Sequence, residues 1–300
     1  VSRWQAGSVN LVINAQAEGF GHDFRAAHGP SICAVGLVVP DRDAVAARAD
    51  HLGIRTVDDR DAPGNLAFPA LRGIGGSLVY LIGEEEADAM WDREFTPTGA
   101  AFDDSPLAID HLAAVVRIEE YLSWQLYWRS LFGLQQSFQA DVIDPSGLVL
   151  SQPLQSADGA LRITLNASEA TGTLSSRFVE HNVGGGYQHI ALSTPDLLQM
   201  AGRMADNGAE ILPIPANYHD DIAARFGLDD QRRDALAKAH IFYDADGNGG
   251  DYLQLYSRAF RKRFFFEFVE RHDYEGYGAP NASIRLASQE RFKYAANDPG

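Results

Sequence analysis

A duplication spaced by 155 residues is the sequence feature that most constrains the fold. Pro40-Asp41 and Pro195-Asp196 each follow an apolar run, and they lie 155 positions apart (195 − 40). The helix-like stretch after each dipeptide closes at a glycine with the same offset, Gly53 and Gly208 (208 − 53). Proline-aspartate suits the start of a helix, and glycine suits the residue just after its end. The repeated unit is therefore strand, helix, strand, and the strand-rich sequence that follows extends it to a βαβββ module.

A third unit of this kind begins at residue 107. The apolar run 107–115 leads into an amphipathic stretch from Glu119 to Phe132. Aromatic and apolar residues recur there largely at helical spacing: Tyr121, Trp124, Leu126, Tyr127, Trp128, Leu131 and Phe132. We interpret this stripe as a helix packed on a sheet rather than as a cofactor platform.

The repeats predict two domains of the α+β class. We place the boundary at Asp104-Ser105-Pro106, which gives an N-terminal domain of residues 1–104 and a C-terminal domain of residues 105–300. The N-terminal domain looks incomplete, because Val9 to Asn14 has the pattern of a late strand and no strand–helix pair precedes it.

Two histidines and one glutamate lie in short apolar runs that we predict to be buried strands. His111, His189 and Glu267 are evenly spaced by 78 residues (189 − 111 and 267 − 189). Two imidazoles and one carboxylate on separate strands are the ligand set of a facial-triad non-haem Fe(II) site. A carboxylate among apolar neighbours is costly to bury unless a cation compensates its charge. Either histidine alone would more often be a core residue, but together the three predict one divalent metal in octahedral coordination.

The duplication predicts that only one copy carries this site. With the offset of 155 residues, His189 corresponds to Ala34 (189 − 155).

Two other motifs are interpreted as turns. Gly184-Gly185-Gly186 precedes a strand rather than a helix, and Asp244 to Asp251 resembles a calcium loop but has Leu255 where the loop needs Glu.

Composition excludes several functional classes. The formal net charge of −16 argues against nucleic acid or an anionic membrane as a partner. The sequence contains neither an apolar run of the roughly 20 residues that a transmembrane helix needs nor a signal peptide. The single cysteine, Cys33, excludes an internal disulfide framework and is interpreted as a small core residue. We therefore expect a soluble cytoplasmic protein.

Several segments are similar to the 4-hydroxyphenylpyruvate dioxygenase family over nearly the whole chain. They are His28-Gly29-Pro30-Ser31, Gly73-Ile74-Gly75-Gly76, Ile109-Asp110-His111, Leu165-Asn166, Gln188-His189, Leu253-Gln254-Leu255-Tyr256 and Phe265-Phe266-Glu267-Phe268. The resemblance implies the vicinal-oxygen-chelate fold, in which two barrels are built from paired βαβββ modules and only the C-terminal barrel holds metal. The first strand and helix of that fold would precede Val1.

The resemblance also implies a site and a chemistry. The family's metal ligands fall on His111, His189 and Glu267, and Fe(II) is the implied metal, with Mg, Mn, Co or Zn as alternatives. Residues implied to bind substrate are Asn166, Gln254, Tyr256, Phe265 and Tyr277. By implication, a 2-oxo acid chelates the metal, and with O2 its aromatic ring is hydroxylated. A homo-oligomer formed through the barrels is also implied.

The chain departs from the family after Tyr277. Ala282 stands where the family has a phenylalanine that closes over the aromatic ring, and Arg285 stands where it has a leucine. A guanidinium in place of an apolar wall suits a smaller or more anionic ligand, so we add Arg285 to the substrate-binding residues. The alternative is that Arg285 turns outward on an amphipathic helix.

The ending Gly278 to Ala287 is more similar to one bacterial offshoot of this family. Its members join an N-terminal sugar-isomerase-like TIM barrel to a dioxygenase-like half, and they are 3-dehydroshikimate dehydratases that form protocatechuate in quinate and shikimate catabolism. The resemblance implies that this chain is the dioxygenase-like portion of such a lyase, with an upstream TIM barrel and a small carboxylate-bearing ligand. A genuine Fe(II) dioxygenase forming homogentisate and a non-catalytic, metal-stabilised binding domain are the alternatives.

Overall fold

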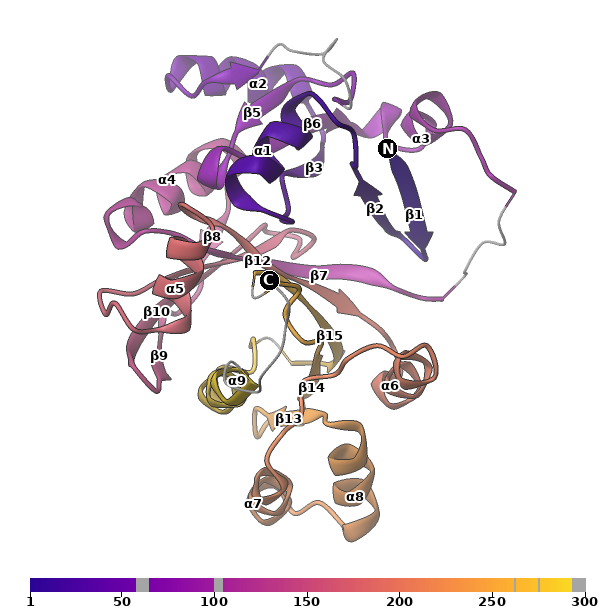
Figure 1. The fold of residues 1–300 in the computed structure, drawn as a ribbon, viewed down its shortest axis with the longest axis vertical. Coiled ribbons are helices and arrows are strands. Elements are labelled where there is room, and N and C mark those ends of the chain that lie inside the picture. The colour runs from indigo at the N-terminus through magenta and orange to yellow at the C-terminus, as the bar shows by residue number, and fades with distance from the viewer. Residues whose placement is uncertain (58–64, 100–104, 262, 275, 293–300) are drawn as a thin grey trace.

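The computed structural model describes residues 1–57, 65–99, 105–261, 263–274 and 276–292 (Figure 1). Strands in the N-terminal part are β1 (Ser2–Ala6), β2 (Val9–Ile13), β3 (Ala34–Val39), β4 (Thr56–Val57), β5 (Ala70–Arg72) and β6 (Leu78–Gly83). Helices there are α1 (Phe20–His28), α2 (Arg42–His51) and α3 (Ala89–Glu94). β1 and β2 form a hairpin, and the other strands form a four-stranded sheet in the order β3-β6-β5-β4.

The C-terminal part of the described chain is built on a nine-stranded sheet in the order β13-β14-β15-β12-β7-β11-β10-β8, with β9 paired to β10. Its strands are β7 (Ala108–Val115), β8 (Gln135–Gln136), β9 (Ala140–Asp144), β10 (Gly147–Gln155), β11 (Arg162–Ala167), β12 (Gly186–Ser193), β13 (Phe242–Ala245), β14 (Asp251–Tyr256) and β15 (Phe265–His272). Its helices are α4 (Tyr121–Phe132), α5 (Leu174–His181), α6 (Leu197–Asp206), α7 (Ala216–Phe226), α8 (Asp230–Ala239) and α9 (Ala279–Phe292).

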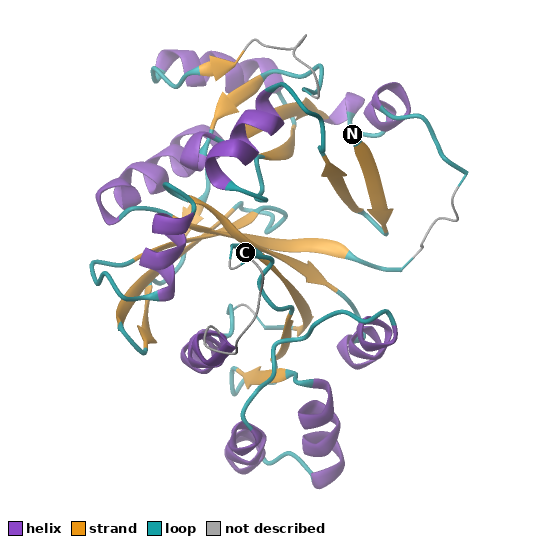
Figure 2. Cartoon of the chain, viewed as in Figure 1, coloured by secondary structure: helices purple, strands orange, loops and turns teal. Residues whose placement is uncertain are grey.

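One strand topology occurs three times. In each module the first strand pairs in parallel with the last strand, as β3 does with β6, β7 with β11 and β12 with β15. The preceding strand then adds to the last one in antiparallel fashion. The two C-terminal modules meet where β7 and β12 pair antiparallel. The structure thus confirms the predicted α+β fold of βαβββ modules. Helix α9 contacts β9 and β13 and lies between them in the opening of the curled sheet (Figure 2).

The duplicated helix ends are confirmed in detail. Asp41 and Asp196 are both N-caps in extended conformation, and their carboxylates accept hydrogen bonds from the backbone N–H groups three residues on. After the helices, Gly53 and Gly208 adopt φ values of 70° and 72°, a conformation that side chains disfavour. Helices α2 and α6 are therefore equivalent elements of the 155-residue repeat.

Two apolar cores pack against the nine-stranded sheet. One lies between the N-terminal sheet, helix α4 and strands β7 and β11, and it includes Leu71, Leu112 and Trp128. The other packs α6, α7 and α8 against strands β13–β15, and it includes Leu236 and Phe242. In the part of the chain that the structure describes, no helix has the length and apolar character needed to cross a membrane.

Several expectations need correction. Leu126 is 63% exposed, because it lies on the outer face of α4 while Trp128 and Leu131 face the core. Cys33 is only half-buried. Helices α7 and α8, inserted between α6 and β13, were not anticipated.

Other expectations stand or stay open. The turn at 244–251 is the predicted hairpin, since β13 and β14 pair antiparallel across it. The predicted domain boundary at Asp104-Ser105-Pro106 lies partly outside the described residues, and it stays a prediction.

Candidate metal centre

Three neighbouring strands place His111, His189 and Glu267 on one face of the sheet. His111 lies on β7, His189 on the adjoining β12 and Glu267 on β15 beyond it. Ala191 pairs with both His111 and Glu267, and residues paired across strands point to the same side of a sheet. Its small side chain leaves room between the two. All three groups are buried, with exposed fractions of 4%, 7% and 2%.

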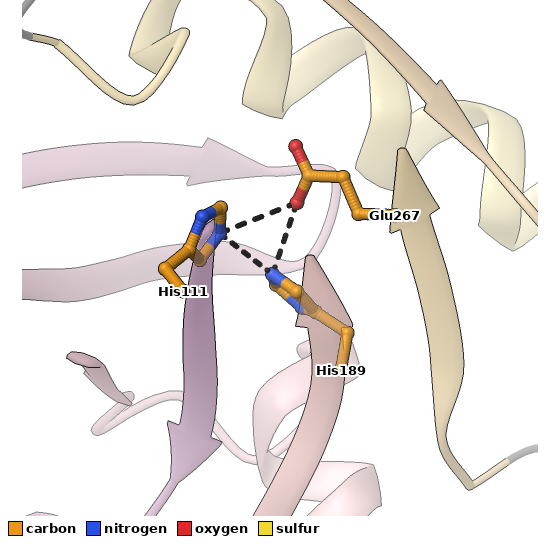
Figure 3. Close-up of side chains that lie close together, drawn as sticks. All are labelled: His111, His189 and Glu267. Carbon is orange, nitrogen blue, oxygen red and sulfur yellow. Dashed lines mark hydrogen bonds and ion pairs between the residues drawn. The ribbon is translucent and has the colours of Figure 1, made fainter. Parts of the chain in front are cut away.

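The three side chains point their ligand atoms at one another (Figure 3). The two Nε2 atoms of His111 and His189 are 3.3 Å apart. Oε2 of Glu267 lies 3.4 Å from His111 Nε2 and 3.1 Å from His189 Nε2. With metal–ligand distances of about 2.1 Å, neighbouring ligands lie about 3.0 Å apart in an octahedron and about 3.4 Å apart in a tetrahedron. The donor set therefore fits a divalent cation, and the predicted octahedral geometry stays a prediction.

The electrostatics of the three groups are strongly coupled. Burial would lower the pKa of His111, but the carboxylates of Glu267 and Asp110 outweigh it and raise the pKa to about 9. Burial lowers the pKa of His189 to about 4. The pKa of Glu267 lies well below its usual value, because the imidazole of His111 outweighs the effect of burial. Opposed shifts in one buried cluster are typical of functional sites.

Asp110 orients His111, and the sequence analysis gave it no role. Asp110 Oδ1 accepts a hydrogen bond of 2.8 Å from His111 Nδ1. In that tautomer the lone pair of Nε2 is free to bind a metal ion. Arg271 in turn donates to Asp110 Oδ1 at 3.0 Å. The β7–β12 pairing shifts register between Ala191 and Leu192, so Asp110 is the extra residue of a bulge. Bulges re-aim side chains in this way, and the Asp-His dipeptide was the only signal in the sequence.

Glu267 is oriented by two residues that the sequence suggested for substrate binding. Its Oε1 accepts hydrogen bonds of 3.0 Å from Gln254 Nε2 and from the Tyr256 hydroxyl. The other oxygen, Oε2, is the one that faces the histidines. Asn281 on α9 donates to Gln254 Oε1 at 3.1 Å, which fixes the amide. Gln254 and Tyr256 thus hold the carboxylate in place.

Three of the other expected substrate residues, Phe265, Tyr277 and Arg285, lie beside the three side chains or beside a ring that contacts them. The ring of Phe265 stacks on His189 with centroids 4.8 Å apart, and the ring of Tyr277 meets His111 edge-on at 5.5 Å. Arg285 does not turn outward, because its guanidinium carbon lies 5.4 Å from the centre of the Tyr256 ring. Asn166 on β11 donates instead to the backbone oxygen of Ala114 at 3.3 Å.

The sheet register identifies a fourth position at the site. The two C-terminal modules are related by an approximate twofold axis, since both pair through their first strands. Glu267 pairs with Ala191 on β12, and the corresponding pair in the other module is Thr164 with Ala113 on β7. Thr164 therefore occupies the register position that corresponds to Glu267, and a hydroxyl side chain stands there in place of a carboxylate.

Sequence comparison shows what the chain is similar to. The family model described as "Hydroxyphenylpyruvate dioxygenase, HPPD, N-terminal" matches residues 1–96. The chain is 37% identical over 298 residues to a 3-dehydroshikimate dehydratase of Pseudomonas aeruginosa, covering 98% of this chain and 47% of that protein. It is 28% identical over 292 residues to a 4-hydroxyphenylpyruvate dioxygenase of the same species, covering 96% of this chain and 82% of that protein. The chain spans about half the length of the dehydratases that it matches.

Solved structures agree with the sequence comparison. A "xylose isomerase-like TIM barrel/4-hydroxyphenylpyruvate dioxygenase fusion protein" superposes with a TM-score of 0.83 at 35% identity, over 97% of this chain and 46% of that one. A mutant 4-hydroxymandelate synthase from Streptomyces coelicolor shares the fold, with a TM-score of 0.76 at 18% identity over 96% of this chain and 86% of that one. These findings confirm the resemblance and the vicinal-oxygen-chelate fold. The relatives named dehydratase and dioxygenase are enzymes.

Proposed function

Because the chain resembles the 4-hydroxyphenylpyruvate dioxygenase family in sequence and in fold, we propose that it is the metal-binding, dioxygenase-like portion of a 3-dehydroshikimate dehydratase. The convergence of His111, His189 and Glu267 on one point supports the metal centre. The higher identity to the dehydratases, 37% against 28%, supports the assignment to that group. An upstream TIM barrel is part of this proposal, and it would carry the dehydration.

The residues around the proposed ion have separate tasks. Asp110 holds the tautomer of His111 that leaves Nε2 free, and Arg271 holds Asp110. Gln254 and Tyr256 keep Oε2 of Glu267 aimed at the site by bonding its other oxygen. A divalent ion, with Fe(II) as our first choice, would supply Lewis-acid chemistry to an oxygen group of the ligand. The rings of Phe265 and Tyr277, which contact His189 and His111, would shield it from water.

A genuine 4-hydroxyphenylpyruvate dioxygenase is the second candidate function. The chain covers 82% of the dioxygenase of Pseudomonas aeruginosa, which favours this alternative. Against it, the guanidinium of Arg285 lies beside the aromatic walls, where a hydroxyphenyl ring would need apolar surface. Oxygen uptake with conversion of 4-hydroxyphenylpyruvate to homogentisate would decide for the dioxygenase. Bound metal without turnover of any substrate would favour a metal-stabilised binding domain.

Metal analysis tests the proposed centre. We expect about one divalent ion per chain in the purified protein and none in Glu267→Ala, because the carboxylate is one of three donors. His219→Ala is the matched control, since His219 is a buried histidine on α7 that bonds the backbone oxygen of Ile241 instead. Equal metal content in Glu267→Ala and wild type would sink the assignment.

The reading frame upstream of Val1 tests the fusion. We expect it to encode a TIM barrel in continuous frame with this chain. A parent gene that lacks such a barrel would rule out the dehydratase assignment and leave the metal centre untouched.

A further inference from the structure

A cation lies next to the proposed metal centre, on the helix that covers it. Arg285 is in the middle of α9, and its guanidinium carbon is 5.4 Å from the ring centre of Tyr256 and 5.7 Å from that of Phe265. The Tyr256 hydroxyl bonds Glu267, and the Phe265 ring stacks on His189. The guanidinium therefore lies beside two aromatic side chains, each of which contacts one of the proposed ligands.

This cation has no carboxylate partner among the described residues. Its hydrogen bond of 2.8 Å goes from Nη1 to Oε1 of Gln289, which is neutral. Other arginines that are mostly buried are neutralised: Arg271 pairs with Asp110 at 3.0 Å, and Arg177 pairs with Glu290. Removing a cation from water without an anion is unfavourable, so an unneutralised arginine at a buried site favours an anionic ligand.

The charge balance of the site points the same way. With a divalent ion bound, Glu267 cancels one of its two charges, and Asp110 cancels the charge of Arg271. Arg162 also lies 3.6 Å from Asp110, but its side chain is 28% exposed and water screens its charge. Arg285 then adds one positive charge, so the occupied centre carries two. A ligand with two negative charges would neutralise it, whereas a ligand with one would leave a buried cation unpaired.

We propose that Arg285 forms an anion subsite of the metal centre, and that the ligand chelates the ion through two oxygen atoms at one end while a carboxylate at its other end binds Arg285. This inference rests on the proposed function, because the chelating end needs the ion. Nη1 of Arg285 is bonded to Gln289, but Nε and Nη2 have no hydrogen-bond partner among the described residues, and together they can bind a carboxylate in a two-bond fork. The hydroxyl of Tyr277, which is buried and has no partner among the described residues, can donate to the same ligand.

Two sources of this chemistry are compatible with the site: a 2-oxo dicarboxylate and a catechol carboxylate. Each has a probe and a counterpart that lacks the carboxylate proposed to bind Arg285. The pairs are 2-oxoglutarate with 2-oxohexanoate, and 3,4-dihydroxybenzoate with catechol. Calorimetric titration of the Zn(II)-loaded chain with each compound measures what the carboxylate contributes.

In the wild-type chain we expect at least one pair to bind with about tenfold preference for the dicarboxylate or catechol carboxylate. That preference should vanish in Arg285→Gln, and Arg285→Lys should keep part of it, because lysine retains the charge but not the fork. Arg291→Gln is the matched control, since it removes the same charge from an exposed position on the same helix. The pair that responds identifies the chelating group.

The outcomes are distinguishable when zinc content is measured on the same samples. A full complement of zinc with no carboxylate preference in either wild-type pair would overturn the subsite and leave the metal centre standing. A preference that survives unchanged in Arg285→Gln, or that is lost equally in Arg291→Gln, would also overturn it. A wild-type chain that takes up no zinc would refute the proposed function and the subsite together.

Discussion

The N-terminal sheet and the C-terminal sheet share one module topology, but they differ in the residues at the register positions of His189 and Glu267. In the C-terminal sheet His189 pairs with Phe265, and two residues further along Ala191 pairs with Glu267. In the N-terminal sheet the same pairs are Ala34 with Leu78 and Gly36 with Tyr80. Ala34 thus stands at the position of His189, as the repeat predicts, and Tyr80 stands at the position of Glu267.

The supporting residues differ in the same way. Tyr256 pairs with Glu267 and bonds it, whereas Ala70 pairs with Tyr80 in the N-terminal sheet. Tyr80 and Ala70 belong to an apolar cluster with Phe68 and Met90. A shared backbone topology is therefore not sufficient for a metal site. Donors, the groups that orient them and a second module all have to be present.

The largest effect is expected from making the C-terminal sheet resemble the N-terminal one. His189→Ala copies Ala34, removes one of three donors and should weaken metal affinity by more than about 100-fold. Tyr80→Phe, at the position equivalent to Glu267, should leave affinity unchanged because no ion binds there. Metal titration of the two variants checks the contrast, and a loss in Tyr80→Phe would show that the sheets had been aligned wrongly.

Asp110→Asn should have the next largest effect. The amide keeps the size of Asp110 but not its charge, and it can donate through Nδ2 as well as accept through Oδ1, so His111 loses the acceptor-only partner that fixes its tautomer. Loss of such a partner costs about 10- to 100-fold in metal affinity. Circular dichroism confirms folding, and an unchanged affinity in the folded variant would mean that Asp110 has only a structural role.

Thr164→Glu should act in the opposite direction. A carboxylate at Thr164 would complete the twofold-symmetric set of ligands, so we expect metal affinity to rise by about tenfold. The added carboxylate would take up a coordination position of the ion, and binding of a chelating ligand should therefore be abolished. Titration with Zn(II) and then with 2-oxoglutarate or 3,4-dihydroxybenzoate measures both. Unchanged metal affinity together with intact ligand binding would show that Thr164 does not face the ion.

The smallest effect is expected from Tyr256→Phe. This change removes one of the two hydrogen bonds to Oε1 of Glu267 but keeps the ring beneath Arg285. Since Gln254 still holds the carboxylate, metal affinity should fall by only about fivefold. A drop as large as that of His189→Ala would contradict this and would make Tyr256 a determinant equal to a donor.

The features that could be predicted from sequence are those with a local signal. Apolar runs located the strands of His111, His189 and Glu267, and the Pro-Asp and Gly pairs located two equivalent helices. The role of Asp110 could not be predicted, because it depends on a bulge that exists only once β7 and β12 pair. Thr164 likewise becomes visible only through the register of β7 and β11.

For Gln254 and Tyr256, the location could be predicted from the sequence but the hydrogen-bond partner could not. Their polar groups and their place beside the site were anticipated, but the partner of each was not, since both could have faced a ligand. The structure turns them to Oε1 of Glu267. Helices α7 and α8 were not predicted because the N-terminal copy of the repeat has no counterpart of them, so a comparison of the two copies gives no sign of the insertion.

The most direct test of the account is an anomalous-difference map from crystals of the chain grown with a divalent metal. We expect one peak about 2.1 Å from Nε2 of His111, Nε2 of His189 and Oε2 of Glu267, and no peak between Ala34 and Tyr80. A fully loaded crystal with its peak elsewhere, or with these three side chains still in contact and no ion among them, would contradict it.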